Sequence, residues 1–414
     1  MKKIFIFIQN RFLLVLFFVL LFIAIRTLYY KNLFVFIFDQ VSSSTAVLEL
    51  WRDKKISLIG PPLSFVIEGK QVFFGGISYL IQLIFLLIGR FNPFWSTYAF
   101  MVFAGIMTIP LYYGVKKLIN QNAAVLVTIL YAFLPFSIES TIALWNPYFL
   151  FALLPILVYL MGLFKEKRGV LTFFLFALLN GILFQLHYMY LFTVIGLLVY
   201  YFVFKRLRIA YFFTFLLGFF LGFGNMILFE LRHNFYNLRT LSFYFTKPQI
   251  VAGHWLADYY FASIVLFILL VVLYLLKKRI SAIFCIGFFV IMLLVSFRYV
   301  TVDTEKRNFP PNWHYADELK VYSIIRKSLD TIKDFNIFEF YVATGTFQKY
   351  LLKRDNILIN FDDYYHNKYL YVVYKDETFQ NDPAYEVNSF KPFKIRNVWK
   401  INPAYNLYLL ERME

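Results

Sequence analysis

The sequence predicts a mainly α-helical, polytopic membrane protein with a small α/β domain at its C-terminal end. Three observations predict this fold class. Hydrophobic residues make up 61% of the 414 residues and charged residues only 16%, whereas an ordinary soluble domain has about 25% charged residues. Several apolar runs are long enough to cross a bilayer. Beyond about residue 300 charges become frequent, and Pro310-Pro311 marks the break.

The composition excludes several classes of protein. Aromatic side chains make up 22% of the chain, which excludes a disordered protein. The net charge of +17 is typical of a membrane protein with basic cytoplasmic loops, and no basic groove with interleaved aromatics indicates a nucleic-acid partner. The single cysteine, Cys285, permits neither an intramolecular disulfide nor a cysteine-based zinc site. The absence of a phosphate loop and of a dinucleotide fingerprint argues against an ATP-driven pump or a nucleotide-sugar enzyme.

Nine segments are apolar throughout rather than along one stripe, as lipid contact requires. No small-residue cleavage site follows the first segment, so we interpret it as a retained span with Arg26, Tyr29 and Tyr30 as its interfacial anchor. We predict crossings at 11–30, 95–114, 122–141, 147–164, 170–187, 189–205, 210–230, 258–277 and 280–298.

A tenth apolar segment, 77–89, decides the orientation of the bundle. At 13 residues it is short for a span, which needs about 17–25 residues. If it does not cross, four basic clusters face the same side as Lys2-Lys3, as the positive-inside bias favours. We therefore predict that 77–89 lies in the outer interface of the plasma membrane, with a cytoplasmic N-terminus and an extracytoplasmic C-terminal domain. The four clusters are Lys116-Lys117, Lys165-Lys167-Arg168, Lys205-Arg206-Arg208 and Lys277-Lys278-Arg279.

The predicted topology places polar chemistry on the outer face. The polar loops 31–76 and 231–257 lie there, whereas the cytoplasmic loops are short and basic. All five histidines also lie at or beyond this face: His187, His233, His254, His314 and His366. We expect any reaction to take place on this side.

The change in composition divides the chain into two predicted domains. The transmembrane domain covers 1–299, with a first outer loop at 31–94, and the extracytoplasmic α/β domain covers 300–414. In the second domain we predict helices at 317–334 and 347–354, strands at 337–343 and 369–374, and a β-hairpin at 398–410 around Asn402-Pro403.

The first outer loop begins with a candidate catalytic carboxylate. Asp39 follows the apolar residues 34–38, and partial desolvation at this place raises the basicity of a carboxylate. Such a group, with Gln40 beside it, can act as a general base or bind a divalent metal ion. The alternative is a helix cap, because an amphipathic interfacial helix is predicted at 44–54. Later in the loop, Gly60-Pro61-Pro62 predicts a rigid turn, and Gly75-Gly76 allows a tight bend.

A group of cations follows the seventh predicted span. Arg232, His233 and Arg239 lie just outside the span, and Glu230 precedes them. The guanidinium group presents a bidentate fork that suits a phosphate. Ordinary contact with lipid headgroups is the alternative.

Three more polar residues reach the predicted outer face. His187 ends a span and is either a catalyst or a hydrogen-bonded interfacial residue. Asn146 lies in a Trp-Asn-Pro stretch. Glu139 lies within the predicted membrane depth, where an isolated carboxylate costs about 2.5–3.5 kcal/mol at the centre of a helix. We expect Glu139 to face a polar cavity or a partner.

The ordered set of these stretches resembles the polyprenyl-phosphate-dependent glycosyltransferases of the GT-C superfamily. The resemblance is to the family-39 group in particular, which is related to protein O-mannosyltransferases and aminoarabinose transferases. It covers about residues 1–240, and an outer α/β domain also fits. The matching stretches are FDQ at 38–40, LIGPP at 58–62, VFFGG at 72–76, NP at 92–93, WNP at 145–147, QLHY at 185–188 and FELRHNF at 229–235.

The resemblance implies the roles of several residues. Asp39 occupies the acidic position of the family, which implies a general base, or a metal ligand, that activates an acceptor. It implies a sugar donor carried on a polyprenyl phosphate, with Arg232, His233 and Arg239 as candidates for holding the phosphate. The implied reaction is an inverting displacement onto a lipid, glycan or protein acceptor. The expected partners are this donor and membrane lipids, the oligomeric state stays open, and a divalent metal ion at Asp39 is the one cofactor left open.

The chain departs from the family pattern at three positions. Ser43 stands where a second acidic residue is common, Phe74-Gly75-Gly76 where His-Gly-Pro is common, and Ile142 where an arginine is common. These departures leave open a changed substrate or an inactive scaffold relative. A transporter or flippase for a polyprenyl-linked glycan is a further alternative, although the sequence has no internal repeat and its polar residues gather at one face.

Overall fold

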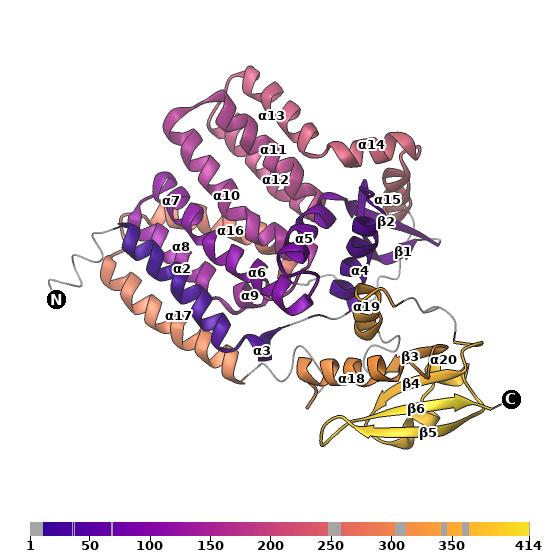
Figure 1. Cartoon of the computed structure of the whole chain (residues 1–414). Coiled ribbons are helices and arrows are strands. Elements are labelled where there is room, and N and C mark those ends of the chain that lie inside the picture. Colours follow the sequence, from indigo (N-terminus) through magenta and orange to yellow (C-terminus); the bar gives the residue numbers. More distant parts are fainter. Residues whose placement is uncertain are drawn as a thin grey trace. The chain divides into compact units, whose positions relative to one another are not determined.

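The structure is a computed structural model that describes residues 11–34, 36, 38–67, 69–246, 258–302, 312–340, 346–357 and 364–413. This part of the chain is mainly helical, as the sequence predicts (Figure 1). The chain packs into two units. The first consists of Met1–Tyr29 and Leu50–Tyr299, and the second of Tyr30–Glu49 and Val300–Glu414. A segment of the predicted first outer loop therefore packs with the C-terminal residues.

The first unit is built from helices that follow the predicted apolar segments (Figure 1). They are α2 (Arg11–Leu28), α5 (Ile77–Ile88), α6 (Pro93–Ile106), α7 (Thr108–Leu118), α8 (Gln121–Phe133), α9 (Pro135–Glu139), α10 (Asn146–Lys167), α11 (Val170–Leu186), α12 (Tyr190–Leu198) with the π-helix η1 (Val199–Phe204), α13 (Ile209–Gly222), α14 (Gly224–Arg232), α15 (Tyr236–Thr246), α16 (Asp258–Leu276) and α17 (Ala282–Val302).

Three of these helical stretches are long and apolar enough to cross a bilayer, within the residues that the structure describes. They are Pro93–Leu118, Asn146–Lys167 and Ala282–Thr301. The pair α13 and α14 would be a fourth if its bend lies inside one span. The other predicted crossings coincide with apolar helices of 10–17 residues. The lengths are compatible with a membrane protein, and the predicted nine crossings are not confirmed.

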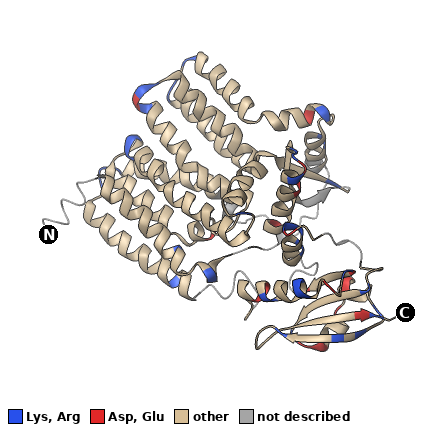
Figure 2. Ribbon diagram, in the orientation of Figure 1, with Lys and Arg blue, Asp and Glu red and all other residues tan. Residues whose placement is uncertain are grey.

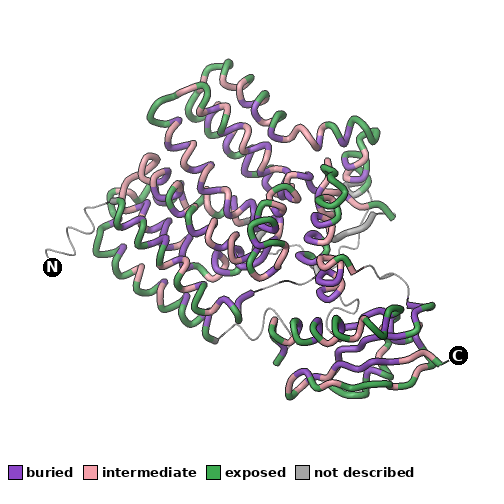
Figure 3. The backbone as a smooth tube through the Cα atoms, viewed as in Figure 1, coloured by how far each residue is buried: buried purple, intermediate pink, exposed green. Residues whose placement is uncertain are grey.

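Burial distinguishes the central helices from the peripheral ones (Figure 3). Within α10, 67% of the most apolar 18-residue stretch is buried, compared with 28% of the stretch in α17. At 1.5 Å per residue, the 22 residues of α10 span about 33 Å, which is close to the thickness of a bilayer core. Helix α10 therefore forms the centre of the unit, and the exposed apolar surface of α17 is typical of a helix in contact with lipid.

Pro135 ends α8 well before the predicted end of the crossing at residue 141. Proline has no N–H to donate, so the helix breaks and the last carbonyls of α8 need other donors. Ser137 Oγ donates to the carbonyl of Tyr131, and Ser296 Oγ donates to that of Phe133. The predicted crossing 122–141 is therefore not one continuous helix, because the short helix α9 begins after the break.

Arg26 donates to the carbonyl between these two, at Ala132, over 2.9 Å. Its Nε donates to Thr141 Oγ1 at 2.9 Å, and its guanidinium lies 3.5 Å from the centre of the Phe22 ring. The Arg26 side chain is fully buried, at 0% exposure. The predicted interfacial anchor is therefore wrong for this residue, which joins α2 to the break between α8 and α9.

Glycines bring the backbones of α11 and α13 into direct contact. A Cβ atom on Gly222 would lie 2.1 Å from the carbonyl oxygen of Leu178, and one on Gly181 would lie 2.1 Å from that of Phe219. Small residues permit this close approach of apolar helices. At Phe223 the chain then bends by 67° into α14. The predicted crossing 210–230 is therefore not one straight helix.

The basic clusters adjoin one another at one end of the first unit. Lys165 Nζ donates to the carbonyl of Lys117 at 3.0 Å, which joins the ends of α7 and α10. Asn120 Nδ2 donates to the carbonyl of Lys277 at 3.0 Å, which joins the start of α8 to the end of α16. Figure 2 shows Lys and Arg gathered at the ends of long helices, with uncharged residues along their lengths.

The first loop of this unit folds into a β-hairpin, of which the sequence predicts only the turns. Strand β1 (Ile59–Ile67) pairs with β2 (Lys70–Gly75) in an antiparallel register that joins Ile59 to Gly75 and Pro62 to Phe73. Irregular pairing on both sides of Pro62 accommodates the prolines, which cannot donate to a sheet.

The second unit combines helices with a four-stranded sheet (Figure 1). Its elements are α3 (Tyr30–Leu33), most of α4 (Phe38–Arg52), α18 (Tyr315–Ser328), β3 (Phe335–Glu339), α19 (Thr346–Arg354), β4 (Tyr369–Tyr374), the 3₁₀ helix η3 (Glu377–Asn381), α20 (Tyr385–Asn388), β5 (Phe393–Lys400) and β6 (Asn406–Arg412). The strand order is β3-β4-β6-β5, with β3 and β4 parallel and the other pairs antiparallel.

The predicted elements of this unit are found close to their expected places. Helix α19 connects the parallel strands β3 and β4, as a crossover must. The predicted hairpin is longer than expected and runs from Phe393 to Arg412, with its turn at Asn402. There, Asn402 Oδ1 accepts hydrogen bonds from the N–H groups of Ala404 at 2.8 Å and Tyr405 at 2.9 Å. Helix α18 ends at Ser328, earlier than the predicted residue 334, and residues 341–343 of the first predicted strand lie outside the described residues.

Candidate functional site

The predicted site residues form two groups, one in each unit. Asp39 and Gln40 lie on α4 in the second unit. All the others belong to the first unit: Glu139, Asn146, His187, Glu230, Arg232, His233 and Arg239. Each group is held in place by contacts within its own unit.

Asp39 presents an exposed carboxylate at the start of α4. Helix α4 begins at Phe38, so Asp39 lies in its first turn rather than before it. The side chain is exposed, and among the described residues no group donates a hydrogen bond to it. The protein atoms around it nevertheless raise the pKa of its carboxyl by desolvation. An exposed carboxylate with a raised pKa is suited to accept a proton from a substrate.

The neighbours of Asp39 support the helix. Gln40 is buried, at 5% exposure. Ser43 is also buried, and its hydroxyl donates to the carbonyl of Asp39 at 2.8 Å and to that of Gln40 at 3.2 Å. The position where the resembled family often has a second acid is therefore occupied by a residue that bonds to the backbone of α4.

In the first unit, stretches far apart in the sequence meet beside β2. Asn146 Nδ2, at the start of α10, donates to the carbonyl of Leu186 at 2.8 Å. The next residue, His187, stacks against the Phe74 ring at 5.6 Å, and Tyr188 stacks against the same ring at 5.3 Å. These contacts join the stretches around 146, 187 and 74. His187 is buried at 5% exposure, so its ring is part of the packing.

Gln185 fills the space next to the hairpin. A Cβ atom on Gly75 would lie 2.1 Å from Gln185 Oε1, so this glycine makes room for the amide. Gln185 Nε2 donates to the carbonyl of Gly222, the last residue of α13 before the bend. Its Oε1 is buried and has no hydrogen-bond donor among the described residues. Gln185 therefore joins α11, α13 and β2.

Glu230 stabilises the start of α15. Its Oε1 accepts from the N–H of Asn237 at 3.2 Å, and its Oε2 accepts from that of Leu238 at 3.4 Å. The first N–H groups of a helix have no intrahelical partner, and a carboxylate is a favourable acceptor for them. Glu230 is buried at 7% exposure. This arrangement assigns a capping role to Glu230.

The three predicted cations differ in their surroundings. His233 Nδ1 lies 2.9 Å from the carbonyl of Phe229, and its ring stacks on the Phe229 ring at 4.3 Å. Arg232 and Arg239 are exposed, and neither takes part in an ion pair among the described residues. Two guanidinium groups are thus available to an anion, whereas the His233 ring is held against α14.

Beside Arg239, strand β2 runs along α15. Phe73 lies near Tyr236, with ring centres 6.2 Å apart, and the Lys70 ammonium lies 5.8 Å from the Phe243 ring. Arg239 is four residues before Phe243 and shares its face of the helix. Lys70 and Arg239 therefore add positive charge to one exposed face of α15 and β2.

Glu139 ends α9 and is exposed, and it accepts a hydrogen bond from the Tyr299 hydroxyl at 3.3 Å. No group of three His, Cys, Asp or Glu side chains that could hold a metal ion occurs within the described residues. Of the histidines, His254 lies outside the described residues, and His314 precedes α18, where its N–H donates to Asp317 at 2.9 Å.

Two residues that hold the hairpin, Asn237 and Tyr188, are not among the predicted site residues. The Tyr188 hydroxyl donates to the carbonyl of Phe73, and Asn237 bonds to the same residue. No local pattern marks a side chain that bonds a distant backbone, although Tyr188 lies inside the QLHY stretch. No protein-family model, no curated protein and no solved structure matches this chain.

Proposed function

We propose that the protein is a membrane glycosyltransferase that moves a sugar from a polyprenyl-phosphate donor to an acceptor on the extracytoplasmic face. The acceptor is a lipid, a glycan or a protein. In this proposal the predicted topology holds, with nine crossings, a cytoplasmic N-terminus and an extracytoplasmic C-terminal domain.

One observation carries the proposal. Five of the seven stretches that resemble the GT-C family are connected by contacts in the first unit. LIGPP and VFFGG pair as the β1–β2 hairpin, and QLHY stacks on it through His187. WNP bonds to QLHY through Asn146, and FELRHNF bonds through Glu230 to Asn237, which holds the hairpin. They lie at the Asn146 end of α10, and the basic clusters lie at its Lys167 end. A site opposite the basic end is an extracytoplasmic site under the positive-inside rule.

The proposed reaction is a displacement at the anomeric carbon. The Asp39 carboxylate removes the proton from the acceptor hydroxyl as its oxygen attacks the sugar. The bond between the anomeric carbon and the phosphate oxygen breaks, and the polyprenyl phosphate leaves with the bonding electrons, so the configuration inverts. A positioned base contributes about 10²–10⁴-fold to the rate. Arg232 and Arg239 neutralise the phosphate of the donor, and His233 supports α14 beside them.

The test is a panel of radiolabelled polyprenyl-phosphate sugars presented to the purified protein in nanodiscs, with and without divalent metal ions. Release of label from one donor would establish the class of enzyme and identify the sugar. Dependence on a metal ion would favour Asp39 as a ligand, and activity in a chelator would favour Asp39 as a base. Binding of donor without release, in the presence of candidate acceptors, would contradict the proposal.

A transporter or flippase is the second candidate, and the 67° bend between α13 and α14 favours it. Transporter sites are often formed by broken helices at the midplane of the membrane. Here the bend lies beside Gln185, at the hairpin end of α11, which favours a site at the surface. Movement of a labelled donor across the bilayer without transfer would support this candidate.

A non-catalytic scaffold remains the alternative suggested by the three departures from the family pattern. All three positions are filled by buried residues: Ser43 at 7%, Phe74 at 6% and Ile142 at 3% exposure. Each of these side chains packs inside its own unit, and none of them replaces Asp39. This supports a changed substrate over a lost activity.

A further inference from the structure

The segment that carries Asp39 is anchored to α18 and α19 by two phenylalanines. Phe34 and Phe36 are buried, at 0% and 1% exposure. The Phe34 ring packs edge-on against Tyr315, with ring centres 4.9 Å apart. The Phe36 ring packs against Phe347 at 5.6 Å and against Tyr350 at 5.2 Å, both on α19. The chain is therefore fixed immediately before α4 begins.

The same segment is fixed again beyond Asp39. Lys353 Nζ, on the last turn of α19, forms an ion pair with Glu49 Oε1 at 2.6 Å. Asp39 thus lies on α4 between two attachments to one helix, Phe36 before it and Glu49 after it. Neither attachment touches the Asp39 carboxylate, which stays exposed.

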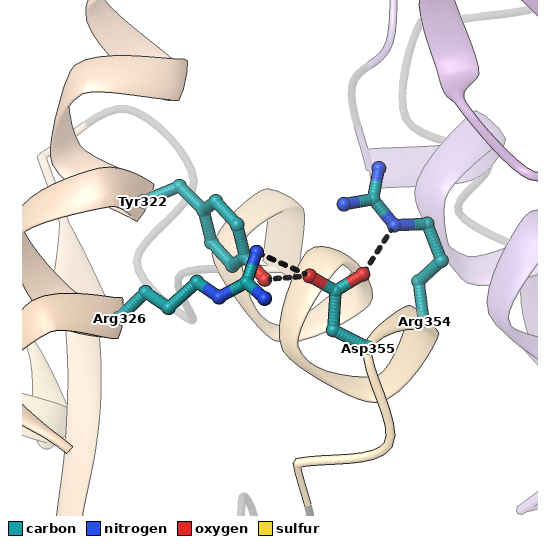
Figure 4. A network of polar contacts seen from close by, with 4 residues as sticks. All are labelled: Tyr322, Arg326, Arg354 and Asp355. Atoms are coloured by element: carbon teal, nitrogen blue, oxygen red, sulfur yellow. Dashed lines mark hydrogen bonds and ion pairs between the residues drawn. The ribbon is translucent and has the colours of Figure 1, made fainter. Parts of the chain in front are cut away.

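Helix α19 is itself held firmly on α18 (Figure 4). The Asp355 carboxylate, just after α19, accepts hydrogen bonds from Arg354 Nε at 2.8 Å and from the Tyr322 hydroxyl, and Arg326 lies 3.3 Å from it. Gln348 Nε2 also donates to the Glu318 side chain. A helix with these contacts to α18 is a rigid support for α4.

We propose that α19 positions Asp39 for catalysis, with Lys353 as the positioning residue that holds α4 through Glu49. This inference rests on the proposed function, because it gives the C-terminal unit a part in the same reaction. An ion pair between partly exposed side chains adds little to global stability, so its loss should leave the fold intact. It should instead free the end of α4 and misplace the base, and a small misplacement of a reacting group can lower the rate by about 10²-fold.

The experiment compares five variants of the full chain in nanodiscs. Lys353→Gln and Glu49→Gln break the pair, Lys353→Arg preserves it, and the double variant Glu49→Lys with Lys353→Glu reverses it. Lys394→Gln is the matched control, since Lys394 pairs with Glu411 at 3.3 Å on the β5–β6 hairpin of the same unit. Two quantities are measured: kcat and KM for sugar transfer, and hydrogen–deuterium exchange of the peptide covering residues 38–49.

Breaking the pair should lower kcat by about 10- to 100-fold with little change in KM and should speed exchange in α4. Lys353→Arg and the reversed pair should restore both, and Lys394→Gln should change neither. Unchanged exchange in Lys353→Gln, or a reversed pair that restores nothing, would overturn the positioning role. If no variant and no wild-type protein transfers sugar, the proposed function fails, while the exchange data still decide whether Lys353 holds α4.

Discussion

Asn237 pairs with the backbone of Phe73 through both polar atoms of its side chain. The Phe73 N–H donates to Asn237 Oδ1 at 3.0 Å, and Asn237 Nδ2 donates to the Phe73 carbonyl at 3.2 Å. The Asn237 amide thus makes the two hydrogen bonds to β2 that the backbone of a neighbouring strand would make. Because Glu230 in turn accepts from the N–H of Asn237, the hairpin, α14 and α15 form one polar assembly.

Removing this amide should release the hairpin. In Asn237→Ala both bonds are lost: the half-buried Phe73 N–H loses its acceptor, and the Phe73 carbonyl keeps the Tyr188 hydroxyl as a donor, so we expect a local destabilisation of about 1 kcal/mol. Hydrogen exchange of the peptide covering 59–75 should speed up. Asn225→Ala is the control, because Asn225 makes a single, longer bond within the described part of the chain, to the Leu58 carbonyl at 3.4 Å. Equal effects of the two variants would contradict the special role of Asn237.

Two substitutions of Glu230 distinguish a role in capping α15 from a role in catalysis. A glutamine keeps one oxygen that can accept from the N–H groups of α15, whereas alanine keeps none. We therefore expect Glu230→Gln to retain most of the sugar transfer and Glu230→Ala to destabilise α15 by about 1 kcal/mol. Exchange of the peptide covering 236–246 reports the helix. Loss of transfer in Glu230→Gln with an intact α15 would instead indicate a direct part in the reaction.

Arg232 and Arg239 should act on donor binding. With the proposed phosphate contact removed, Arg232→Gln and Arg239→Gln should each raise KM for the donor by about tenfold, in line with charge-assisted hydrogen bonds of about 1.5–3 kcal/mol. Lysine should restore the charge but not the bidentate geometry. Arg90→Gln, at an exposed arginine elsewhere in the first unit, is the control. If donor affinity is unchanged in both variants, these two arginines do not hold the phosphate of the donor.

The second unit should lose stability as the pH rises, because of Glu339. This carboxyl is fully buried, and burial raises its pKa to about 7. Glu318, buried beside it, also has a raised pKa for the same reason. Since the folded state holds the proton more tightly than the unfolded state, the stabilisation is complete below the unfolded pKa of 4.5 and is lost as the pH rises through about 7.

Glu339→Gln should therefore stabilise the unit at about pH 8 and have little effect at about pH 5, because glutamine resembles the protonated acid. Pulse proteolysis in urea, followed by quantification of peptides from α18 and α19, measures this in the full chain. The control variant is Glu377→Gln, at an exposed glutamate of the same unit, and its effect on stability should not depend on pH. A Glu339→Gln variant that is equally stabilising at both pH values would contradict the raised pKa.

The sequence predicts the helices well because each apolar segment carries its own signal. It predicts α19 and the hairpin turn at Asn402 from local patterns alone. The sequence-based predictions fail where contacts between residues far apart in the chain determine the local structure. Pro135 breaks α8, and the break is tolerated because Arg26 and Ser296, far away in the chain, satisfy the freed carbonyls. The bend at Phe223 follows Gly218 and Gly222 of α13, and the backbone of α11 lies too close to both for a side chain, which the sequence of α13 alone does not show.

The candidate site shows the same limit. Asp39 could be proposed from its place after an apolar run, but its attachment to α19 depends on Lys353, which lies in a different predicted domain. Glu230 and His233 look like site residues in sequence because charged side chains follow a span. In the structure Glu230 caps a helix and His233 packs on Phe229. A polar residue near a membrane surface has the same sequence signature whether it binds a ligand or a backbone.

The central claim is tested most directly by release of sugar from the labelled polyprenyl-phosphate donor by three proteins: wild type, Asp39→Asn and Asp53→Asn. Asp53 is the matched control, since it is exposed near the end of the same loop segment and pairs with Lys55 at 2.8 Å. We predict that Asp39→Asn lowers the rate by about 10²–10⁴-fold in folded protein while Asp53→Asn stays near wild type. Release by Asp39→Asn at the wild-type rate would contradict it.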